Sequence, residues 1–332
     1  MDIIQKIEAR AKNSDKRIIF PESDDERVLK AAEQITRKKI ARVILVGGEK
    51  RVRARTRSLG ISLNGIEIAN PLSSEKFDRY VSVYARKAEI TENTARLIVQ
   101  KPLFFAALAV AAGDADSMIA GAVHTSGDVI AVTKNVIGLQ KGITVPSSFF
   151  LMNIPGYKGG EQGTLMYADA SVNPNPGSEE LADIAVVSGK TAERLLGWKP
   201  RIALLSFSTK GSAEHHDVCK VTDALEIARK KAPKLLIDGE LQADSALVMS
   251  VARRKMKNVG KVAGKANILI FPDLDAGNIA YKLTQILAGA KAYGPILQGF
   301  AMPVSDLSRG ASVQDIIGVA AILAVWSKRW MR

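Results

Sequence analysis

Residues 17–47 read RIIFPESDDERVLKAAEQITRKKIARVILVG, and this stretch decides the fold. It begins and ends with short β-branched runs, 17–21 and 42–47, which are typical of buried strands. Between the two runs, apolar residues recur at intervals of three and four, the pattern of an amphipathic helix. A strand, a helix and a second strand in this order predict a βαβ unit with parallel strands.

The same alternation continues along most of the chain, and it predicts an α/β fold with largely parallel sheets. Further strand-like runs lie at 117–121, 201–207, 234–238 and 267–272, with longer helical patterns between them. In such folds, ligands bind where loops leave the carboxyl ends of the strands. The loops that follow these runs are therefore the first places to search for a site.

The glycine-rich segment NIPGYKGGEQGT, residues 153–164, interrupts this rhythm and is the candidate for a domain boundary region. A second crossing near residue 300 would return the last helix to the first domain. The predicted domains are accordingly 1–147 with 300–332, and 148–299.

The composition excludes several classes of protein. The chain has 332 residues, of which 47% are hydrophobic, and its one cysteine, Cys219, cannot form an internal disulfide. One cysteine and three histidines make a metal cluster unfavourable, so we expect no metal and a reducing compartment. The longest apolar stretches, 103–112 and 317–326, have about half of the roughly 20 residues that span a bilayer. We expect them to be core helices, and we expect a cytoplasmic protein because the N-terminus lacks the apolar region of a signal peptide.

The net charge of +13 raises the question of a polyanionic partner. Lysine and arginine are densest at 49–57 and 252–261. Neither run has interleaved aromatic residues that could stack on bases, and no zinc-finger or RNP pattern is present. We interpret both runs as solvated helix faces and expect no nucleic-acid partner.

The segment PVSDLSRGASVQDI, residues 303–316, concentrates polar groups between two apolar runs. Ser312 and Asp315 have the spacing of a capping box at the start of a helix. Arg309 does not fit that interpretation, because a cation ahead of a helix N-terminus is unfavourable in the field of the helix dipole. It is explained if an anion lies between the guanidinium and the free N–H groups. This segment therefore predicts a phosphate or carboxylate site.

Three other loops follow strand-like runs and could accept an anion. The loop SFSTKGS, residues 206–212, fits anion binding and ordinary turn chemistry equally well. Thr125 and Ser126, at the start of a predicted helix, either accept an anion or cap that helix. The segment 271–282 is the third, and within it Asn278 and Lys282 lie four residues apart and so share a helix face.

Two motifs resemble known ligand-binding motifs, but we interpret both as structural. SGKT, residues 188–191, resembles the end of a phosphate-binding P-loop, but Ala185 occupies the place of the required glycine and the preceding residues are helical in pattern. The run HHD, residues 215–217, resembles a metal site, but adjacent residues on a helix point about 100° apart. A polar helix start explains it better.

Several long segments together resemble the phosphate acetyl/butyryl transferase family, and within it the phosphate acetyltransferases. They are FPESDDERVLKAA, ADASVNPNPGSEELADIAVVSGKTAERL, LLSFSTKGSA, LIDGELQADSA, KANILIFPDLDAGNIAYK and AYGPILQGFAMPVSDLSRGASVQDI. The resemblance implies two three-layer α/β/α domains with an interdomain cleft, of the isocitrate/isopropylmalate dehydrogenase-like fold, and a homodimer. It implies reversible transfer of an acetyl group between coenzyme A and phosphate in acetate metabolism. No bound cofactor is implied, coenzyme A being a substrate, and stimulation by monovalent cations stays open.

The resemblance also implies roles for individual residues. In the family's ternary-complex mechanism a thiolate attacks acetyl phosphate directly, and the matching motif places the base at Asp315. Ser308 would hydrogen-bond the acetyl carbonyl, and Arg309 would hold the phosphate. The substrate-binding positions implied are Arg86, Thr125, Ser126, Lys282, Tyr293 and Gly294.

The chain departs from the family pattern at two places. Ala88 and Glu89 follow the RK pair of Arg86 where the family has a basic residue and a glycine. Ala131 and Val132 occupy the positions of an Arg-Pro pair whose Arg the family uses in substrate or coenzyme A binding, and Lys134 is a candidate for a substitute cation.

The departures leave alternatives open. One is a phosphate butyryltransferase-like enzyme with a preference for longer acyl chains. Another is a weakly active homologue that binds coenzyme A or phosphate. An oxidoreductase of the isocitrate dehydrogenase type is disfavoured, because the sequence lacks a nucleotide fingerprint and a metal-carboxylate cluster.

Overall fold

The computed structural model describes residues 3–330, and the chain forms two compact units. The first unit comprises residues 1–140 and 300–332, and the second comprises residues 141–299. The last helix thus belongs to the same unit as the first strand. The first unit ends at residue 140, whereas the sequence placed the boundary at 147.

The first unit is built on a sheet in the order β3-β2-β1-β4-β11, in which every pairing is parallel. Its strands are β1 (Arg17–Phe20), β2 (Arg42–Val46), β3 (Ile66–Ala69), β4 (Ser117–Ala120) and β11 (Val304–Asp306). Its helices are α1 (Ile3–Ala11), α2 (Glu26–Arg37), α3 (Glu49–Ser58), η1 (Pro71–Ser73), α4 (Phe77–Ala88), α5 (Glu92–Val99), α6 (Pro102–Ala111), α7 (Ser126–Val136) and α13 (Val313–Trp330). The βαβ unit predicted from residues 17–47 is confirmed as β1, α2 and β2.

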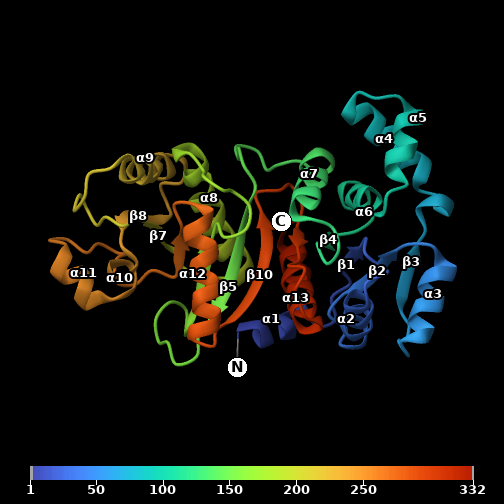
Figure 1. Ribbon diagram of the computed structural model, residues 1–332, viewed down its shortest axis with the longest axis horizontal. Coiled ribbons are helices and arrows are strands. Elements are labelled where there is room, and N and C mark those ends of the chain that lie inside the picture. The colour runs from blue at the N-terminus through green and yellow to red at the C-terminus, as the bar shows by residue number, and fades with distance from the viewer. Residues whose placement is uncertain (1–2, 331–332) are drawn as a thin grey trace. The chain divides into compact units, whose positions relative to one another are not determined.

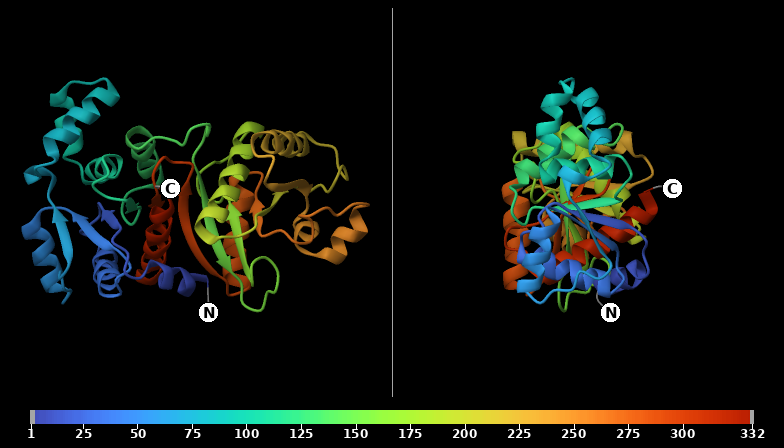
Figure 2. Two further views of the ribbon diagram at one scale, coloured as in Figure 1. Left: turned by 180° about the vertical axis from the view of Figure 1, so that it is seen from behind. Right: turned by 90° about the vertical axis from the view of Figure 1, so that its right-hand side faces the viewer.

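Helices cover both faces of this sheet (Figure 1). Helices α2 and α13 pack against each other on one face, and α6 packs with α7 on the other. The apolar stretches that form α6 and α13 are almost entirely buried, which confirms that they are core helices. Helices α4 and α5 form a further layer outside α6, at the upper left in the left-hand view of Figure 2.

The second unit has a mixed sheet in the order β10-β5-β6-β9-β7-β8. Its strands are β5 (Ser147–Asn153), β6 (Thr164–Ala168), β7 (Arg201–Leu205), β8 (Leu236–Leu241), β9 (Ile268–Ile270) and β10 (Lys291–Gln298). Its helices are α8 (Ser178–Thr191) with its π-helical extension η2 (Ala192–Leu196), α9 (His216–Lys231), α10 (Ala243–Leu247), α11 (Met249–Lys255) and α12 (Leu274–Leu287). Helices α8 and α9 pack together on one face of this sheet, and α12 packs against β5, β6 and β10.

The glycine-rich segment 153–164 is not a domain boundary. It joins β5 to β6, which pair antiparallel inside the second unit. Glycine marks tight turns as readily as linkers, so the sequence signal did not distinguish a hairpin from a boundary. β8 also extends to Leu241, beyond the predicted end at 238, because it continues through polar residues that break the apolar pattern.

The SGKT motif lies inside α8 and forms no phosphate-binding loop, as predicted. Ser188 is fully buried and its hydroxyl accepts a hydrogen bond from Gln298 at 2.8 Å. A Cβ on Gly189 would lie 2.7 Å from a methyl group of Ile202, so the glycine permits close packing of α8 on the sheet. The motif is part of the core.

Within residues 3–330, no single helix is long and apolar enough to cross a bilayer. By length and composition alone, α5 and α6 would pass such a test together, but the pair is bent by 105°.

Candidate active site

Three neighbouring strands of the first unit end at the same edge of the sheet. β4 pairs in parallel with β1 on one side and with β11 on the other, so the segments that follow these strands meet. They are the loop after β1, the turn 121–125 after β4, and residues 307–312 after β11, which we call the site loop. Ser308 and Arg309 lie in the site loop, Asp315 follows it, and Thr125 and Ser126 lie at the end of the turn after β4, so these five candidates belong to this edge.

The turn 121–125 is folded around the carboxylate of Glu22, whose side chain is only 2% exposed. Glu22 Oε1 accepts hydrogen bonds from the backbone N–H groups of Gly121, Val123 and His124 at 3.1, 2.9 and 2.8 Å, and Oε2 accepts one from Ala122 at 2.8 Å. His124 Nδ1 lies 2.8 Å from Oε1. The turn does accept an anion, but that anion is a side chain of the protein itself.

These contacts shift the titration of both side chains. Burial opposes ionisation of Glu22, but the hydrogen bonds from His124 and from the backbone outweigh it and lower the pKa of the carboxyl group. The hydrogen bond to Glu22 in turn raises the pKa of the His124 imidazole against the opposing effect of burial. Glu22 is therefore a fixed internal negative charge under neutral conditions.

Thr125 and Ser126 are both engaged by other parts of the protein. Thr125 caps α7 in a capping box with Asp128, and its hydroxyl donates to Asp128 Oδ2 at 2.7 Å. The hydroxyl of Ser126 acts on Asp306 and lowers the pKa of its carboxyl group. The structure thus gives both residues a role in the local fold, and their role in substrate binding stays a prediction.

Asp306, the last residue of β11, is a buried carboxyl group next to the site loop. Burial raises its pKa to about 6, the Ser126 hydroxyl opposes this, and the nearby charge of Glu22 adds to it. Its Oδ1 atom is buried without a hydrogen-bond partner among the described residues. A Cβ on Gly121 would lie 2.6 Å from the backbone N of Leu307, so only glycine allows this close approach of the two segments.

The site loop presents Ser308 and Arg309 to solvent. Ser308 Oγ accepts a hydrogen bond from the N–H of Gly310 at 3.3 Å, which leaves its own proton available. The Arg309 guanidinium has no hydrogen bond or ion pair with any described residue. Two polar side chains thus remain available to a ligand at this position.

Asp315 follows the site loop in the first turn of α13. Its Oδ2 accepts hydrogen bonds from the N–H and the hydroxyl of Ser312 at 2.9 and 2.8 Å, and Ser312 Oγ accepts from the N–H of Asp315 at 3.2 Å. The predicted capping box is confirmed. The other carboxylate oxygen of Asp315 has no partner among the described residues, so the capping role leaves one oxygen available.

Arg86 lies in the last turn of α4, where its side chain is exposed. The neighbouring Lys87 donates to the carbonyl of Val136 at 2.7 Å, which ties the end of α4 to the end of α7. On α7, Ala131 and Lys134 are exposed and lie three residues apart on one helix face. The chain therefore presents cations from two contacting helices.

Lys282, Tyr293 and Gly294 belong to the second unit. Lys282 is exposed on α12, with Nζ 5.1 Å from the ring centroid of Tyr281. Tyr293 and Gly294 lie on β10, and a Cβ on Gly294 would approach the carbonyl oxygen of Phe149 to 2.7 Å. Asn278, which shares a face with Lys282, donates its side-chain amide to the carbonyl of Ala170 at 3.1 Å.

The loop 206–212, which we call the serine loop, is occupied by internal hydrogen bonds. Ser208 Oγ and the N–H of Gly211 donate to the buried Glu240 Oε1 at 2.9 and 2.7 Å. Lys210 Nζ forms an ion pair with Asp238 at 2.7 Å. Of the two interpretations of this loop, the structure favours turn chemistry.

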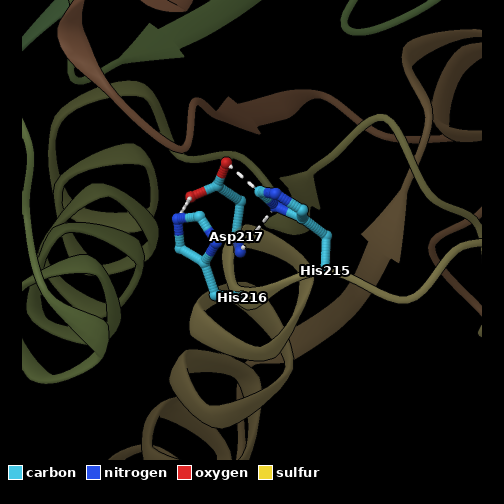
Figure 3. A group of neighbouring side chains, drawn as sticks. All are labelled: His215, His216 and Asp217. Atoms are coloured by element: carbon cyan, nitrogen blue, oxygen red, sulfur yellow. Dashed lines mark hydrogen bonds and ion pairs between the residues drawn. The ribbon is translucent and has the colours of Figure 1, made fainter.

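The side chains of His215, His216 and Asp217 converge at the start of α9 (Figure 3). His215 is the N-cap residue, and its Nδ1 accepts a hydrogen bond from the N–H of Asp217 at 3.3 Å. The positive end of the helix dipole disfavours a cation at this position. We assign the cluster to capping, in line with its interpretation as a polar helix start.

Sequence reasoning missed three residues that organise this edge: Glu22, Asp306 and Arg27. Arg27 donates hydrogen bonds to backbone carbonyls of both the turn 121–125 and the site loop. The only available signal was the density of charged residues directly after the first strand, in PESDDER. That signal does not reveal which distant backbone atoms the side chains meet.

Comparison with known proteins identifies relatives over the full length of the chain. A family model described as phosphate acetyl/butaryl transferase matches residues 2–324. The chain is 47% identical over 328 residues to the phosphate acetyltransferase of Acetivibrio thermocellus, covering 98% of both chains. It is 38% identical to that of Bacillus subtilis, covering 97% of this chain and 98% of the relative. The crystal structure of a phosphotransacetylase from Streptococcus pyogenes superposes with a TM-score of 0.91 at 37% identity, with 98% of each chain covered.

Proposed function

The chain belongs to the phosphate acetyl/butyryl transferase family, and from this premise we propose that it is a phosphate acetyltransferase. The reaction is the reversible conversion of acetyl-CoA and phosphate to coenzyme A and acetyl phosphate. Full-length relatives named phosphate acetyltransferase, at 38 to 47% identity, support the acetyl group over longer acyl chains.

One observation carries this proposal. In the segment 308–315, the protein leaves a hydroxyl proton, a guanidinium and a carboxylate oxygen without internal partners. These are the three kinds of group that acyl transfer between a thiol and a phosphate requires: a donor for the carbonyl oxygen, a cation for the phosphate and a base for the thiol.

In the proposed mechanism the free oxygen of Asp315 takes the proton of the coenzyme A thiol. The thiolate sulfur attacks the carbonyl carbon of acetyl phosphate, and a C–S bond forms. The C–O bond to phosphate then breaks, phosphate leaves with the bonding electron pair, and the proton taken by Asp315 ends on phosphate. No acyl-enzyme is required, because both substrates are bound together.

Ser308 and Arg309 act on charges that develop during this step. The Ser308 hydroxyl donates to the carbonyl oxygen as it becomes negative, and the Arg309 guanidinium binds the phosphate oxygens in both directions of the reaction. A carboxylate is a weaker base than a thiolate, so transfer of the thiol proton to Asp315 is unfavourable by itself. Cations that stabilise the thiolate must therefore assist.

We propose that Arg86 and Lys134 bind the phosphate groups of coenzyme A. Both are exposed and lie on α4 and α7, which contact each other. Lys134 lies on the same face of α7 as Ala131, where the family has an arginine. Replacing Lys134 with Met should raise the KM for coenzyme A and leave the KM for phosphate unchanged. Lys282, Tyr293 and Gly294 remain predicted substrate contacts of the second unit.

We propose a homodimer that uses the exposed face of α12. Ile279, Leu283, Ile286 and Leu287 are 54, 50, 76 and 79% exposed, and they recur at helical spacing on this one helix. Light scattering should give twice the mass of the chain, and a Leu283→Glu, Ile286→Glu variant should give the mass of one chain. If the variant kept the doubled mass, another surface would be the interface.

The reaction needs coenzyme A as a free thiol, so we place the enzyme in the cytoplasm, where thiols are kept reduced. Thiol, acyl group and phosphate supply every atom of the reaction, so we propose that no bound cofactor takes part. Stimulation by monovalent cations is tested by comparing rates in potassium and sodium salts.

The function is tested by phosphate-dependent release of free coenzyme A thiol, followed with a thiol-reactive dye. Acetyl-CoA, propionyl-CoA and butyryl-CoA are compared in parallel, with phosphate-free controls. We expect fast release from acetyl-CoA that vanishes without phosphate. A clear preference for butyryl-CoA would assign the protein to the longer-acyl branch, and release from none of the three would leave a non-catalytic homologue.

A further inference from the structure

Arg27 connects the two loops that border the candidate site. From the first turn of α2, its Nη1 atom donates to the backbone carbonyls of Arg309 and Ala311 at 2.6 and 3.1 Å. Its Nη2 atom donates to the carbonyl of Ala122 at 3.0 Å. One side chain therefore fixes backbone groups of the site loop and of the turn 121–125.

Asp25 holds this guanidinium in place. Arg27 Nε and Nη2 donate to Asp25 Oδ1 and Oδ2 at 3.1 and 2.7 Å, a bidentate pair. Asp25 also caps α2 by accepting the N–H groups of Arg27 and Val28. The hydrogen bond with Asp25 raises the pKa of the Arg27 guanidinium, so the contact persists wherever Asp25 is ionised.

The geometry uses every donor that an arginine has. A guanidinium carries five N–H groups, and the five contacts of Arg27 match them one to one. No donor is left for a substrate, so Arg27 does not act on the reacting atoms. Lysine, with three donors on one atom, cannot reproduce the planar arrangement.

An arginine at position 27 does not stabilise α2, so its presence there needs another explanation. A cation in the first turn of a helix is disfavoured by the helix dipole. Here the cation faces three carbonyl oxygens of neighbouring loops. The residue therefore serves the geometry of those loops.

We propose that Arg27 is a positioning residue that holds the site loop in the conformation in which Ser308 and Arg309 meet the substrate. This inference rests on the proposed function. By fixing the carbonyls of Arg309 and Ala311, Arg27 fixes the peptide planes 309–310 and 311–312, and the first of these constrains the backbone that carries the Arg309 side chain. A shift of about 1 Å in such a group reduces a rate about 100-fold.

The test compares Arg27→Met with Arg17→Met. Arg17 is a matched control, because its side chain is 37% exposed against 31% for Arg27 and it also binds one aspartate and one backbone carbonyl. It lies at the start of β1, at the opposite end of that strand from the site. Effects that arise from the loss of any paired, partly exposed arginine should appear equally in both variants.

Two measurements are made on each full-length variant. Hydrogen exchange reports the order of the loops without any need for activity, and we expect faster exchange in peptides covering 307–312 and 121–125 for Arg27→Met alone. Steady-state kinetics should show kcat lowered about 10- to 100-fold and KM for phosphate raised, with KM for coenzyme A within about twofold. Arg27→Lys should recover part of the rate.

A double-mutant cycle completes the test. In an Arg309→Gln background, Arg27→Met should lower kcat by a smaller factor than in the wild type, because one of the two groups that it positions is gone and only Ser308 remains. Unchanged exchange of the site loop in Arg27→Met, or kinetics equal to those of Arg17→Met, would overturn the proposal. If the wild type fails to transfer acetyl groups, the proposed function falls, and with it the claim that this positioning serves catalysis.

Discussion

The serine loop and the site loop are alike in sequence but opposite in structure. Each follows a parallel strand, β7 or β11, and each combines serine, glycine and one cation. In the serine loop, Lys210 pairs with Asp238, and Ser208 donates to Glu240. In the site loop, the side chains of Ser308 and Arg309 face solvent. A loop rich in anion-binding groups is free to bind a ligand only if the fold has not supplied the anion itself.

The reason is energetic. A buried donor that loses its partner costs roughly 1–3 kcal/mol, so an internally paired loop does not release its groups to an incoming anion without a matching gain. An exposed cation such as Arg309 loses little more than water when it binds phosphate. The pairing of a loop, more than its composition, separates structural loops from functional ones.

Arg309→Gln should have the largest effect, and on activity. Its guanidinium has no internal partner among the described residues, so the free energy of unfolding should change by less than about 0.5 kcal/mol. The loss of phosphate binding in the transition state should lower kcat roughly 10²- to 10⁴-fold. Steady-state kinetics and chemical denaturation measure the two quantities. A variant with nearly normal kcat would remove Arg309 from the mechanism.

Glu240→Ala should show the opposite pattern in the serine loop. The hydroxyl of Ser208 and the N–H of Gly211 would lose their buried acceptor, so we expect the free energy of unfolding to fall by about 2–4 kcal/mol. The kcat of the folded protein should stay within about threefold of the wild type, with Asp238→Asn as a partly exposed control. If kcat collapsed while the fold persisted, the serine loop would take part in the reaction and the comparison would fail.

The sequence was sufficient for the class of fold but not for its exact strands. Six predicted strands correspond to β1, β2, β4, β7, β8 and β9, whose apolar or β-branched residues give a clear pattern. Five strands were not among the predicted runs: the short parallel strands β3 and β11, and the strands β5, β6 and β10, which form the antiparallel pairings of the second unit. Part of the reason is that Gly294 and Pro295 interrupt β10, and that β5 and β6 flank a glycine-rich turn with the signature of a linker.

The site was predictable in part for a related reason. Ser308, Arg309, Ser312 and Asp315 lie within eight residues, so local capping and dipole rules could interpret them. Glu22 and Arg27 act on atoms about 100 and 280 positions away in the chain. No local pattern carries that information, because it arises only when three parallel strands end at the same edge.

Asp306→Asn sharpens the comparison, because this carboxyl group differs from Glu240 in having one unpaired buried oxygen. Its pKa is about 6 in the folded protein against 3.8 as reference. The folded state therefore binds more protons between these values, and the free energy of unfolding falls as the pH rises through this range. The side chain of the variant does not ionise, so its free energy of unfolding does not fall in this way. The variant should therefore be about 1–3 kcal/mol more stable than the wild type at pH 7 to 8.

The measurement is urea denaturation of both proteins from pH 4 to pH 8. The difference should be smallest near pH 4, where Asp306 is mostly protonated in the folded state. A difference that did not change with pH would mean that the carboxyl group is ionised throughout and has a partner. In that case Asp306, beside the site loop, would be fully paired, as Glu240 is beside the serine loop.

Ser312→Ala should have the smallest effect, and it separates the two roles of Asp315. The variant removes the hydroxyl that accepts from the N–H of Asp315 and donates to its Oδ2, so it should cost about 1 kcal/mol of stability. The free oxygen of Asp315 is untouched, so kcat should fall less than about fivefold. Asp315→Asn disturbs the same cap but also removes the base, which should lower kcat at least roughly 10²-fold. If the two variants lost equal activity, Asp315 would act through the helix cap, and the site loop would be a structural loop like its counterpart in the second unit.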